Sequence, residues 1–222
     1  MMTPTNCDRG GCLLLGIALA LVQCPVLNAQ ESVSDRSPKR SFTSQDGLFR
    51  FIYSGSLVSC EKDPGQPDRW TPDESCQAVI PVCSDVSGNS DNTAACVAYP
   101  ATRIERGTDF EAAAFSVNIL TDANTDRACL SVAEPPPHVG TRHTETINGV
   151  KFSVTQTDGV AAGNLLDGYS YRSFHGKICY ELDLRIAFSN IGNYDSASAK
   201  NFDLQEVRRS LKNVLVSFKF LK

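Results

Sequence analysis

The stretch Lys177-Ile-Cys-Tyr-Glu-Leu-Asp-Leu-Arg-Ile-Ala-Phe188 carries the strongest structural signal in this sequence. Apolar residues stand at every second position from Ile178 to Phe188, which is the period of a β-strand that packs one face against a core. We therefore predict a long strand whose other face is polar. The polar row consists of Cys179, Glu181, Asp183 and Arg185.

This strand forms the second arm of a predicted hairpin. Residues 168–174 supply the first arm, and His175-Gly176 is the predicted turn. Alternating apolar residues predict further strands at 48–53, 110–120 and 147–154. The chain is therefore rich in predicted strands.

A helix is predicted to begin at Asp203, because its carboxylate can accept hydrogen bonds from the first free amides and Glu206 can reach back toward it. An apolar stripe at helical spacing would face the core, and it consists of Leu204, Val207, Leu211 and either Val214 or Leu215. Water would surround three cations of this segment, Arg208, Arg209 and Lys212. Residues 216–221 alternate again and predict a short closing strand.

Three stretches lack periodicity. Residues 61–95 are rich in Pro, Gly, Asp and Ser and are predicted to form a long loop that disulfides hold in place. Residues 134–146 are a second predicted loop, because the triple proline at 135–137 fits neither a helix nor a central strand. Residues 30–46 contain almost no apolar residue and are predicted to be a disordered lead-in.

Residues 1–29 are typical of a secretory signal peptide, with a polar start that holds Arg9, an apolar segment, and the small residue Ala29 at the end. The apolar segment of about 11 residues is roughly half of what a membrane-spanning helix needs, and no later segment is long enough, so no transmembrane anchor is expected. Acylation at Cys24 is a weaker alternative, because Gln23 stands where a lipoprotein signal needs a small residue. The sequence predicts a secreted or periplasmic protein.

The formal net charge is a mild -4. Removal of the predicted signal peptide takes away Asp8 and Arg9 and leaves this balance unchanged. A mildly acidic chain gives no electrostatic footprint for nucleic acid. No basic run is longer than Lys39-Arg40 or Arg208-Arg209, so the sequence by itself gives no sign of an anionic membrane partner.

Six cysteines follow the predicted signal peptide, and an even number in an exported chain predicts three disulfides. Six cysteines allow 15 connectivities, among which a sequence does not choose. Proximity along the chain is the only guide to the pairing. It suggests the pairs Cys60–Cys96, Cys76–Cys83 and Cys129–Cys179.

Several of these segments together resemble the PsbP-like family. The resemblance rests on Phe49-Arg-Phe-Ile-Tyr53, Gly149-Val150-Lys151-Phe152, Lys177-Ile-Cys-Tyr-Glu-Leu182, and the closing helix that leads into Val216-Ser-Phe-Lys-Phe220. It implies an α+β fold, namely an α/β/α sandwich with a central antiparallel sheet, here stapled by disulfides. It also implies a single domain over residues 47–222, in which a Cys-rich insert at 61–96 departs from the family pattern.

The same resemblance implies a role. Members of this family mostly serve as accessory or binding proteins of the bacterial envelope or the thylakoid lumen, and they share no catalytic residues that could be carried over to this chain. We therefore expect an exported, non-enzymatic protein whose partner is an unknown protein or small ligand.

The two histidines of the proline-rich loop are candidate metal ligands. His138 and His143, with Glu134 or Glu145, could hold zinc if their spacing allowed a full set of ligands. Loop histidines are more often solvated, so we predict no metal and no cofactor.

Two other groups of residues could carry chemistry. His175 and Cys179 could form a nucleophilic pair, but an oxidising compartment favours a cystine at Cys179. Glu181, Asp183 and Arg185 form a candidate groove, because paired carboxylates beside an arginine can exchange protons. Two alternatives to the accessory role therefore stay open: an exported hydrolase that uses this face, and an inhibitor-like or structural protein that acts through the Cys-rich loop.

Overall fold

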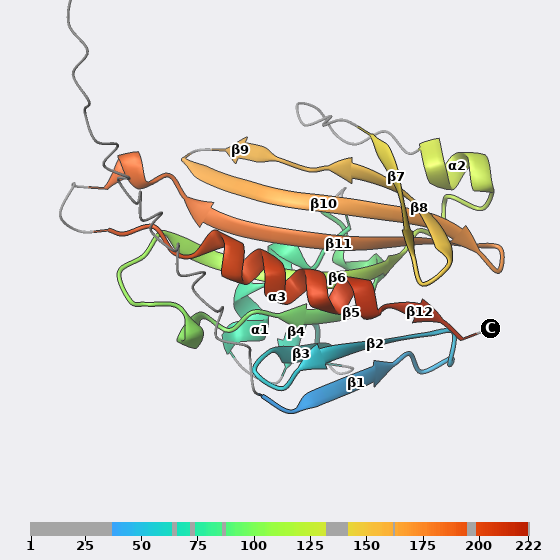
Figure 1. Ribbon diagram of the computed structural model, residues 1–222, viewed down its shortest axis with the longest axis horizontal. Helices are drawn as coiled ribbons and strands as arrows, with labels where there is room; N and C mark the ends of the chain where they lie inside the picture. Colours follow the sequence, from blue (N-terminus) through green and yellow to red (C-terminus); the bar gives the residue numbers. More distant parts are fainter. Residues whose placement is uncertain are drawn as a thin grey trace, which may run out of the picture. The chain divides into compact units, whose positions relative to one another are not determined.

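The hairpin of β10 (Asn164–His175) and β11 (Ile178–Ser189) lies at the centre of the computed structural model (Figure 1). The structure describes residues 37–63, 66–71, 74–85, 88–131, 142–161, 163–194 and 199–221. All of them belong to one compact unit, Asp35–Lys222. The predicted signal peptide at 1–29, with Cys24, lies outside the described residues.

The hairpin belongs to a large sheet in which every pairing is antiparallel. Across this sheet the strands follow the order β4 (Gln66–Thr71), β3 (Val58–Asp63), β5 (Thr93–Ala98), β6 (Phe110–Ile119), β11, β10, β8 (Val150–Gln156) and β7 (His143–Ile147). A short strand, β9 (Gly159–Ala161), also pairs with β10. The predicted α+β class with a central antiparallel sheet is confirmed.

The turn of the hairpin lies one residue later than predicted. Gly176 and Lys177 are its two central residues, with φ of 57° and 67°, and His175 pairs with Ile178. Positive φ at both central positions gives the turn the twist that two antiparallel strands need. This position of the turn sets the register of the whole hairpin.

The apolar face of β11 forms the main core together with α3 (Leu204–Ser217) (Figure 1). The helix begins as predicted, because Asp203 Oδ1 accepts a hydrogen bond from the Glu206 amide at 2.9 Å. Its buried stripe also matches the prediction, except that Leu204 is only half-buried. The buried residues of the helix are Val207, Leu211, Val214 and Leu215.

A small second sheet completes this core. It consists of β1 (Lys39–Thr43), β2 (Phe49–Ser54) and β12 (Lys219–Phe220). β1 falls within 30–46, so the prediction of a disordered lead-in is wrong for residues 39–43. The single aromatic residue of that stretch accounts for the difference, because Phe42 stacks on Phe51 with ring centroids 4.9 Å apart. The predicted closing strand shrinks to β12, since α3 continues to Ser217.

The opposite face of the large sheet carries α1 (Glu74–Ala78), α2 (Asp126–Ser131) and the 3-10 turn η1 (Ile80–Val82). β4, α1, η1 and the end of β3 fall within 61–95, so that stretch is not the structureless loop that we predicted. Part of 134–146 is β7, which pairs along its whole length with β8. The triple proline at 135–137 lies outside the described residues.

The remaining elements are 3-10 turns. They are η2 (Ser90–Asn92), η3 (Ala101–Arg103) and η4 (Ile191–Asn193).

Candidate functional site

Three disulfides fasten other segments to the polar side of the large sheet. They join Cys60 to Cys76, Cys83 to Cys96, and Cys129 to Cys179, with Cα–Cα distances of 5.5, 5.9 and 5.4 Å. The third is the pair that proximity suggested. The first two replace the suggested pairs Cys60–Cys96 and Cys76–Cys83, which are wrong.

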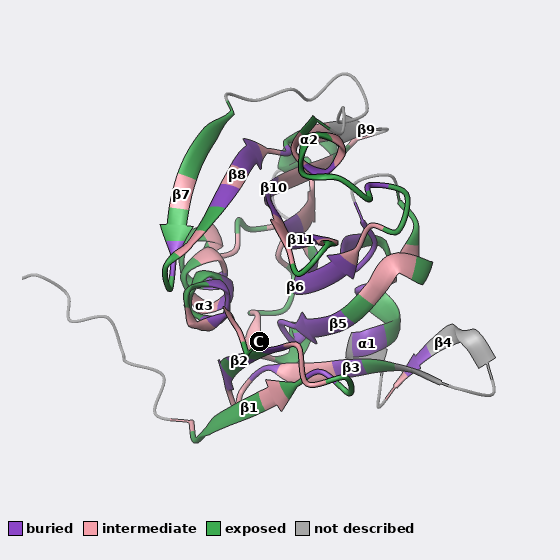
Figure 2. Cartoon of the chain, turned by 90° about the vertical axis from the view of Figure 1, so that its right-hand side faces the viewer, coloured by how far each residue is buried: buried purple, intermediate pink, exposed green. Residues whose placement is uncertain are grey.

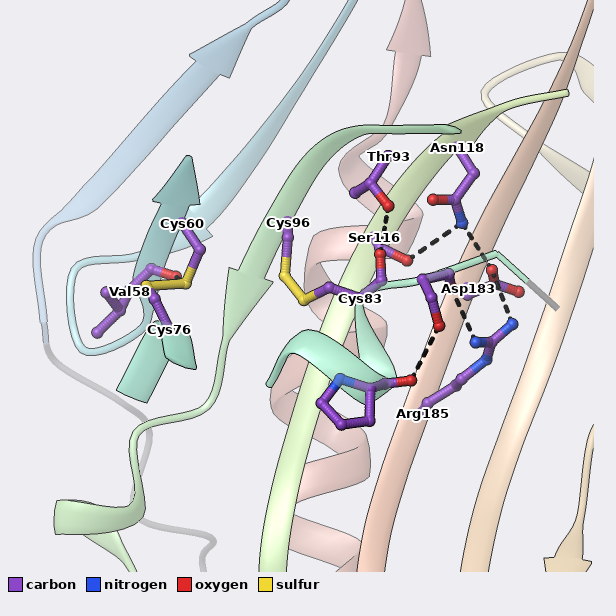
Figure 3. Close-up of a disulfide and its surroundings, with 12 residues drawn as sticks. Val58, Cys60, Cys76, Cys83, Thr93, Cys96, Ser116, Asn118, Asp183 and Arg185 are labelled. Carbon is purple, nitrogen blue, oxygen red and sulfur yellow. Dashed lines mark hydrogen bonds and ion pairs between the residues drawn. A yellow bond between two sulfur atoms is a disulfide. The ribbon is translucent and has the colours of Figure 1, made fainter. Parts of the chain in front are cut away.

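The fold of residues 61–96, the Cys-rich segment, explains why two of the disulfides differ from the suggested pairs. Cys60 and Cys96 are direct neighbours across β3 and β5, so both side chains face the same side of the sheet. α1 brings Cys76 over the first of these strands, and the residue after η1, Cys83, reaches the second (Figure 3). The segment is therefore fastened to two strands at once.

The predicted polar row of β11 lies beneath this cover. In register, Asp183 pairs with Ser116 of β6, which in turn pairs with Cys96 of β5, so the disulfide and the carboxylate share one row of the sheet. Glu181 and Asp183 are 0% exposed and Arg185 is 5% exposed. Figure 2 shows the same burial along β5 and β6.

Asp183 is held by neighbours on two strands (Figure 3). Asn118 of β6 donates a hydrogen bond from Nδ2 to Asp183 Oδ2 at 2.8 Å, and Arg185 Nη2 lies 3.1 Å from the same oxygen. Burial raises the pKa of the Asp183 carboxyl well above its ordinary value; the charge of Arg185 opposes this shift, and Glu181 adds to it.

Glu181 forms the second ion pair of the row. Its Oε2 lies 2.7 Å from both Nε and Nη2 of Arg172, which is its register partner on β10. Sequence reasoning missed Arg172, although a polar residue in the first arm of the hairpin was a visible signal. Two cations and two carboxyl groups thus occupy one buried layer.

Arg185 ties this layer to the Cys-rich segment. Its Nη1 donates to the backbone carbonyls of Ser84 at 2.8 Å and Asp85 at 3.0 Å. Gly168 makes room for it on β10, because a Cβ there would come within 2.7 Å of Thr157 Oγ1 and 3.3 Å of Arg185 Cγ. The guanidinium therefore works as an anchor for the segment that covers the row.

The candidate groove at Glu181, Asp183 and Arg185 is accordingly not an open surface. Its side chains are paired with one another and with their neighbours, and the Cys-rich segment lies over them. The reason is that alternation within a strand identifies a polar face but carries no information about what packs on it. A substrate has no access to these carboxyl groups in this conformation.

The two described histidines, His143 and His175, have different surroundings. Cys179 is bonded to Cys129, and the His175 ring stacks on Phe220 at 4.0 Å, so these two residues form no nucleophilic pair. His143 contacts Glu145 at 3.0 Å, whereas His138 and Glu134 lie outside the described residues. In the part of the chain that the structure describes, no three residues of the His, Cys, Asp or Glu types gather as they would around a metal ion.

A pocket of about 310 Å³ opens beside the start of α3. Its wall is mostly apolar, with Leu165 and Phe188 opposite each other in the hairpin register and Leu204 from the helix. Asp158 and Asp167 also line it, and Asp167 forms an ion pair with Arg208 at 2.7 Å. This pocket could not be predicted from the sequence, because its residues come from four separate segments.

Within the described residues, no helix is both long and apolar enough to span a bilayer.

Comparisons with known proteins bear on the fold. No protein-family model and no curated protein matches this chain. It is similar to a protein of known crystal structure from Bacteroides thetaiotaomicron VPI-5482, with 10% identity and a TM-score of 0.44. That match covers 82% of this chain and 48% of the Bacteroides protein. This chain therefore spans about half of the length of the Bacteroides protein.

The chain is also similar to cyanobacterial PsbP (CyanoP) from Synechocystis sp. PCC 6803. The identity is 9% and the TM-score is 0.43, over 85% of this chain and 96% of that one. Both similarities concern the fold alone.

Proposed function

We propose that this chain is an exported accessory or binding protein of the cell envelope that carries no active site on its charged sheet face. The observation that carries the proposal is the set of three disulfides within the described domain. Disulfides of this kind form and persist in oxidising compartments. The signal-like sequence at 1–29 supports the same route, with residue 30 as the first of the exported chain.

The buried ion pairs support the non-enzymatic part of the proposal. An acid or base must reach the group whose proton it exchanges, within hydrogen-bonding distance or through one water. Glu181 and Asp183 have no exposed surface and are paired with Arg172 and Arg185. Their arrangement serves to dock the Cys-rich segment on the sheet, and the hydrolase alternative therefore has no observation in its favour.

The finer architecture is part of the proposal. With α3 on one face of the large sheet and α1 and α2 on the other, we propose the α/β/α sandwich that the family resemblance implies.

In such a protein, the pocket beside α3 is the place for a small apolar ligand. Its volume is at the lower end of the range for ligand pockets, and its wall is mostly apolar.

The test is the covalent state of the protein after export. The full-length chain is expressed in a host that exports it, and the intact mass is measured with and without reduction. We expect a chain that begins near Gln30 and a non-reduced mass lower by six hydrogens, as three disulfides require. A protein that keeps its leader and titrates as fully reduced would overturn the proposal.

A further inference from the structure

α3 presents a basic side to solvent, opposite its buried stripe. Positions three and four apart share one side of a helix, and this side carries Gln205, Arg208, Arg209, Lys212, Asn213 and Val216. Arg208 is paired with Asp167. Arg209 and Lys212 are exposed and form no ion pair with a described residue.

The small sheet continues this charge. Arg50 of β2 is exposed and stands directly opposite Lys219 of β12. Lys39 of β1 is exposed and lies on the same outer side of the small sheet as Arg50, because side chains two positions apart in a strand share a face. Like charges that face each other across two strands destabilise a sheet. β1, β2 and β12 contain no carboxylate that could offset them.

The two surfaces adjoin at the end of α3. Ser217 Oγ lies 2.7 Å from the Ile52 amide nitrogen, which places the last turn of the helix against β2. Three aliphatic side chains are exposed around this junction: Ile52 at 43%, Val216 at 47% and Leu221 at 41%. We call the whole surface the basic face, made of Lys39, Arg50, Arg209, Lys212 and Lys219 with these three aliphatic residues.

We infer that the basic face docks the protein on an anionic lipid surface. This inference rests on the proposed function, which brings the protein into the cell envelope. Clustered cations are attracted to anionic headgroups, and exposed aliphatic side chains add apolar contact at the same surface. Sequence runs gave no sign of such a partner, because the five cations come from four separate elements and meet only in the fold.

The composition of the basic face favours lipid over an acidic protein. Protein interfaces are enriched in Tyr, Trp and Arg and depleted in Lys, and their binding energy concentrates in a few anchors that fill pockets. Three of the five cations here are lysines, and no aromatic residue stands among them. Lipids diffuse laterally and can match cations that are spread over four elements without a preformed pocket.

The experiment measures binding of the exported, oxidised protein to vesicles by sedimentation. One set of vesicles contains equal parts of phosphatidylglycerol and phosphatidylcholine, and the other contains phosphatidylcholine alone. We expect binding to the first set only, with loss of binding as salt is raised. The triple variant Arg209→Gln/Lys212→Gln/Lys219→Gln should bind about 100-fold more weakly, because each cation near an anionic surface contributes roughly a factor of five.

The matched control is Arg127→Gln/Lys151→Gln. Both cations are exposed, and they lie on α2 and on the outward positions of β8, on the other side of the large sheet. This variant should bind as the parent does. Equal binding by the triple variant, binding to neither vesicle, or preference for soluble polyglutamate over vesicles would each overturn the inference.

The salt dependence of the parent protein tests the inference even if the triple variant folds poorly. Intact mass and thiol content, measured on the same preparation, report on export. A protein with three disulfides that ignores vesicles therefore contradicts only the docking inference.

Discussion

The hydroxyl of Ser217 lies between the two backbone groups of Ile52, 2.7 Å from the amide nitrogen and 2.9 Å from the carbonyl oxygen. It also lies 2.7 Å from the Val214 carbonyl oxygen within its own helix. β12 pairs with β2 only at Phe49 and Arg50, so at Ile52 it no longer lines the side of β2 opposite β1. The last residue of α3 takes the place that a longer β12 would have filled.

Ser217→Ala should lower the free energy of unfolding by about 1 kcal/mol, because the Ile52 amide loses its acceptor. For a domain of this size, that corresponds to a drop in Tm of roughly 2–4 °C in a thermal melt. Ser210→Ala is the matched control, since Ser210 lies on the same helix and its hydroxyl makes no hydrogen bond with a described residue. Equal Tm values for the two variants would show that the contact contributes nothing.

Asn148 closes the C-terminal end of α3 from the turn between β7 and β8. Its Nδ2 donates to the carbonyls of Val216 at 2.9 Å and Phe218 at 2.7 Å, and its φ is 49°. Asn148→Gly keeps this left-handed conformation but removes both hydrogen bonds, so we expect a loss of about 1–2 kcal/mol in urea unfolding.

Asn148→Asp should cost more than Asn148→Gly at neutral pH. A carboxylate cannot donate to the two carbonyls, and it places a negative charge at the negative end of the helix dipole. The difference between the two variants should shrink in acid, where the new carboxyl is protonated. The same cost for both variants at neutral pH would contradict this role of Asn148.

Strands and the closing helix could be predicted because their periods are visible in the sequence. The register of the central hairpin could not, since it depends on one residue of the turn. A turn at His175-Gly176 would pair Arg172 with Cys179, whereas the turn at Gly176-Lys177 pairs Arg172 with Glu181. A shift of one turn residue thus decides whether a buried carboxylate has a cation opposite it.

The cover over the polar row was beyond prediction for a different reason. Alternation places Glu181, Asp183 and Arg185 on one side of the sheet but does not say what packs there. The covering segment has no period of its own, and its place is determined by two disulfides and by Arg185, which binds the carbonyls of residues 84 and 85. These are contacts between distant parts of the chain.

The disulfide pattern is directly testable by mass mapping without reduction. Trypsin does not separate Cys76, Cys83 and Cys96, because no Lys or Arg lies between Arg69 and Arg103. Pepsin is suited to the task, since it cleaves at apolar residues and works in acid, where thiolates are too scarce for disulfide exchange. We expect linked peptides for Cys60–Cys76 and Cys83–Cys96, and a linked peptide joining Cys60 to Cys96 would contradict the structure.

Asp183 should make stability depend on pH. Burial raises its pKa in the folded protein, with Arg185 opposing and Glu181 adding to the shift, and Ser170 and Asn118 are the uncharged groups around it. The folded state therefore holds the proton of the Asp183 carboxyl more tightly than the unfolded state does. The contribution of this proton to the free energy of unfolding is fully present below the unfolded pKa. It is lost as pH rises through the folded pKa.

Asp183→Asn replaces the titrating carboxyl by an amide that does not ionise. As pH rises from about 4, the variant should therefore gain stability relative to the parent. The gain should be up to about 1.4 kcal/mol for each pH unit, until the folded carboxyl of the parent ionises. Urea unfolding of both proteins across that range measures the difference. Glu181→Gln is the contrasting variant, because it takes the buried partner of Arg172 away and should cost about 3–5 kcal/mol at neutral pH. A constant difference between Asp183→Asn and the parent would mean that Asp183 is already ionised in the fold, with Arg185 outweighing its burial.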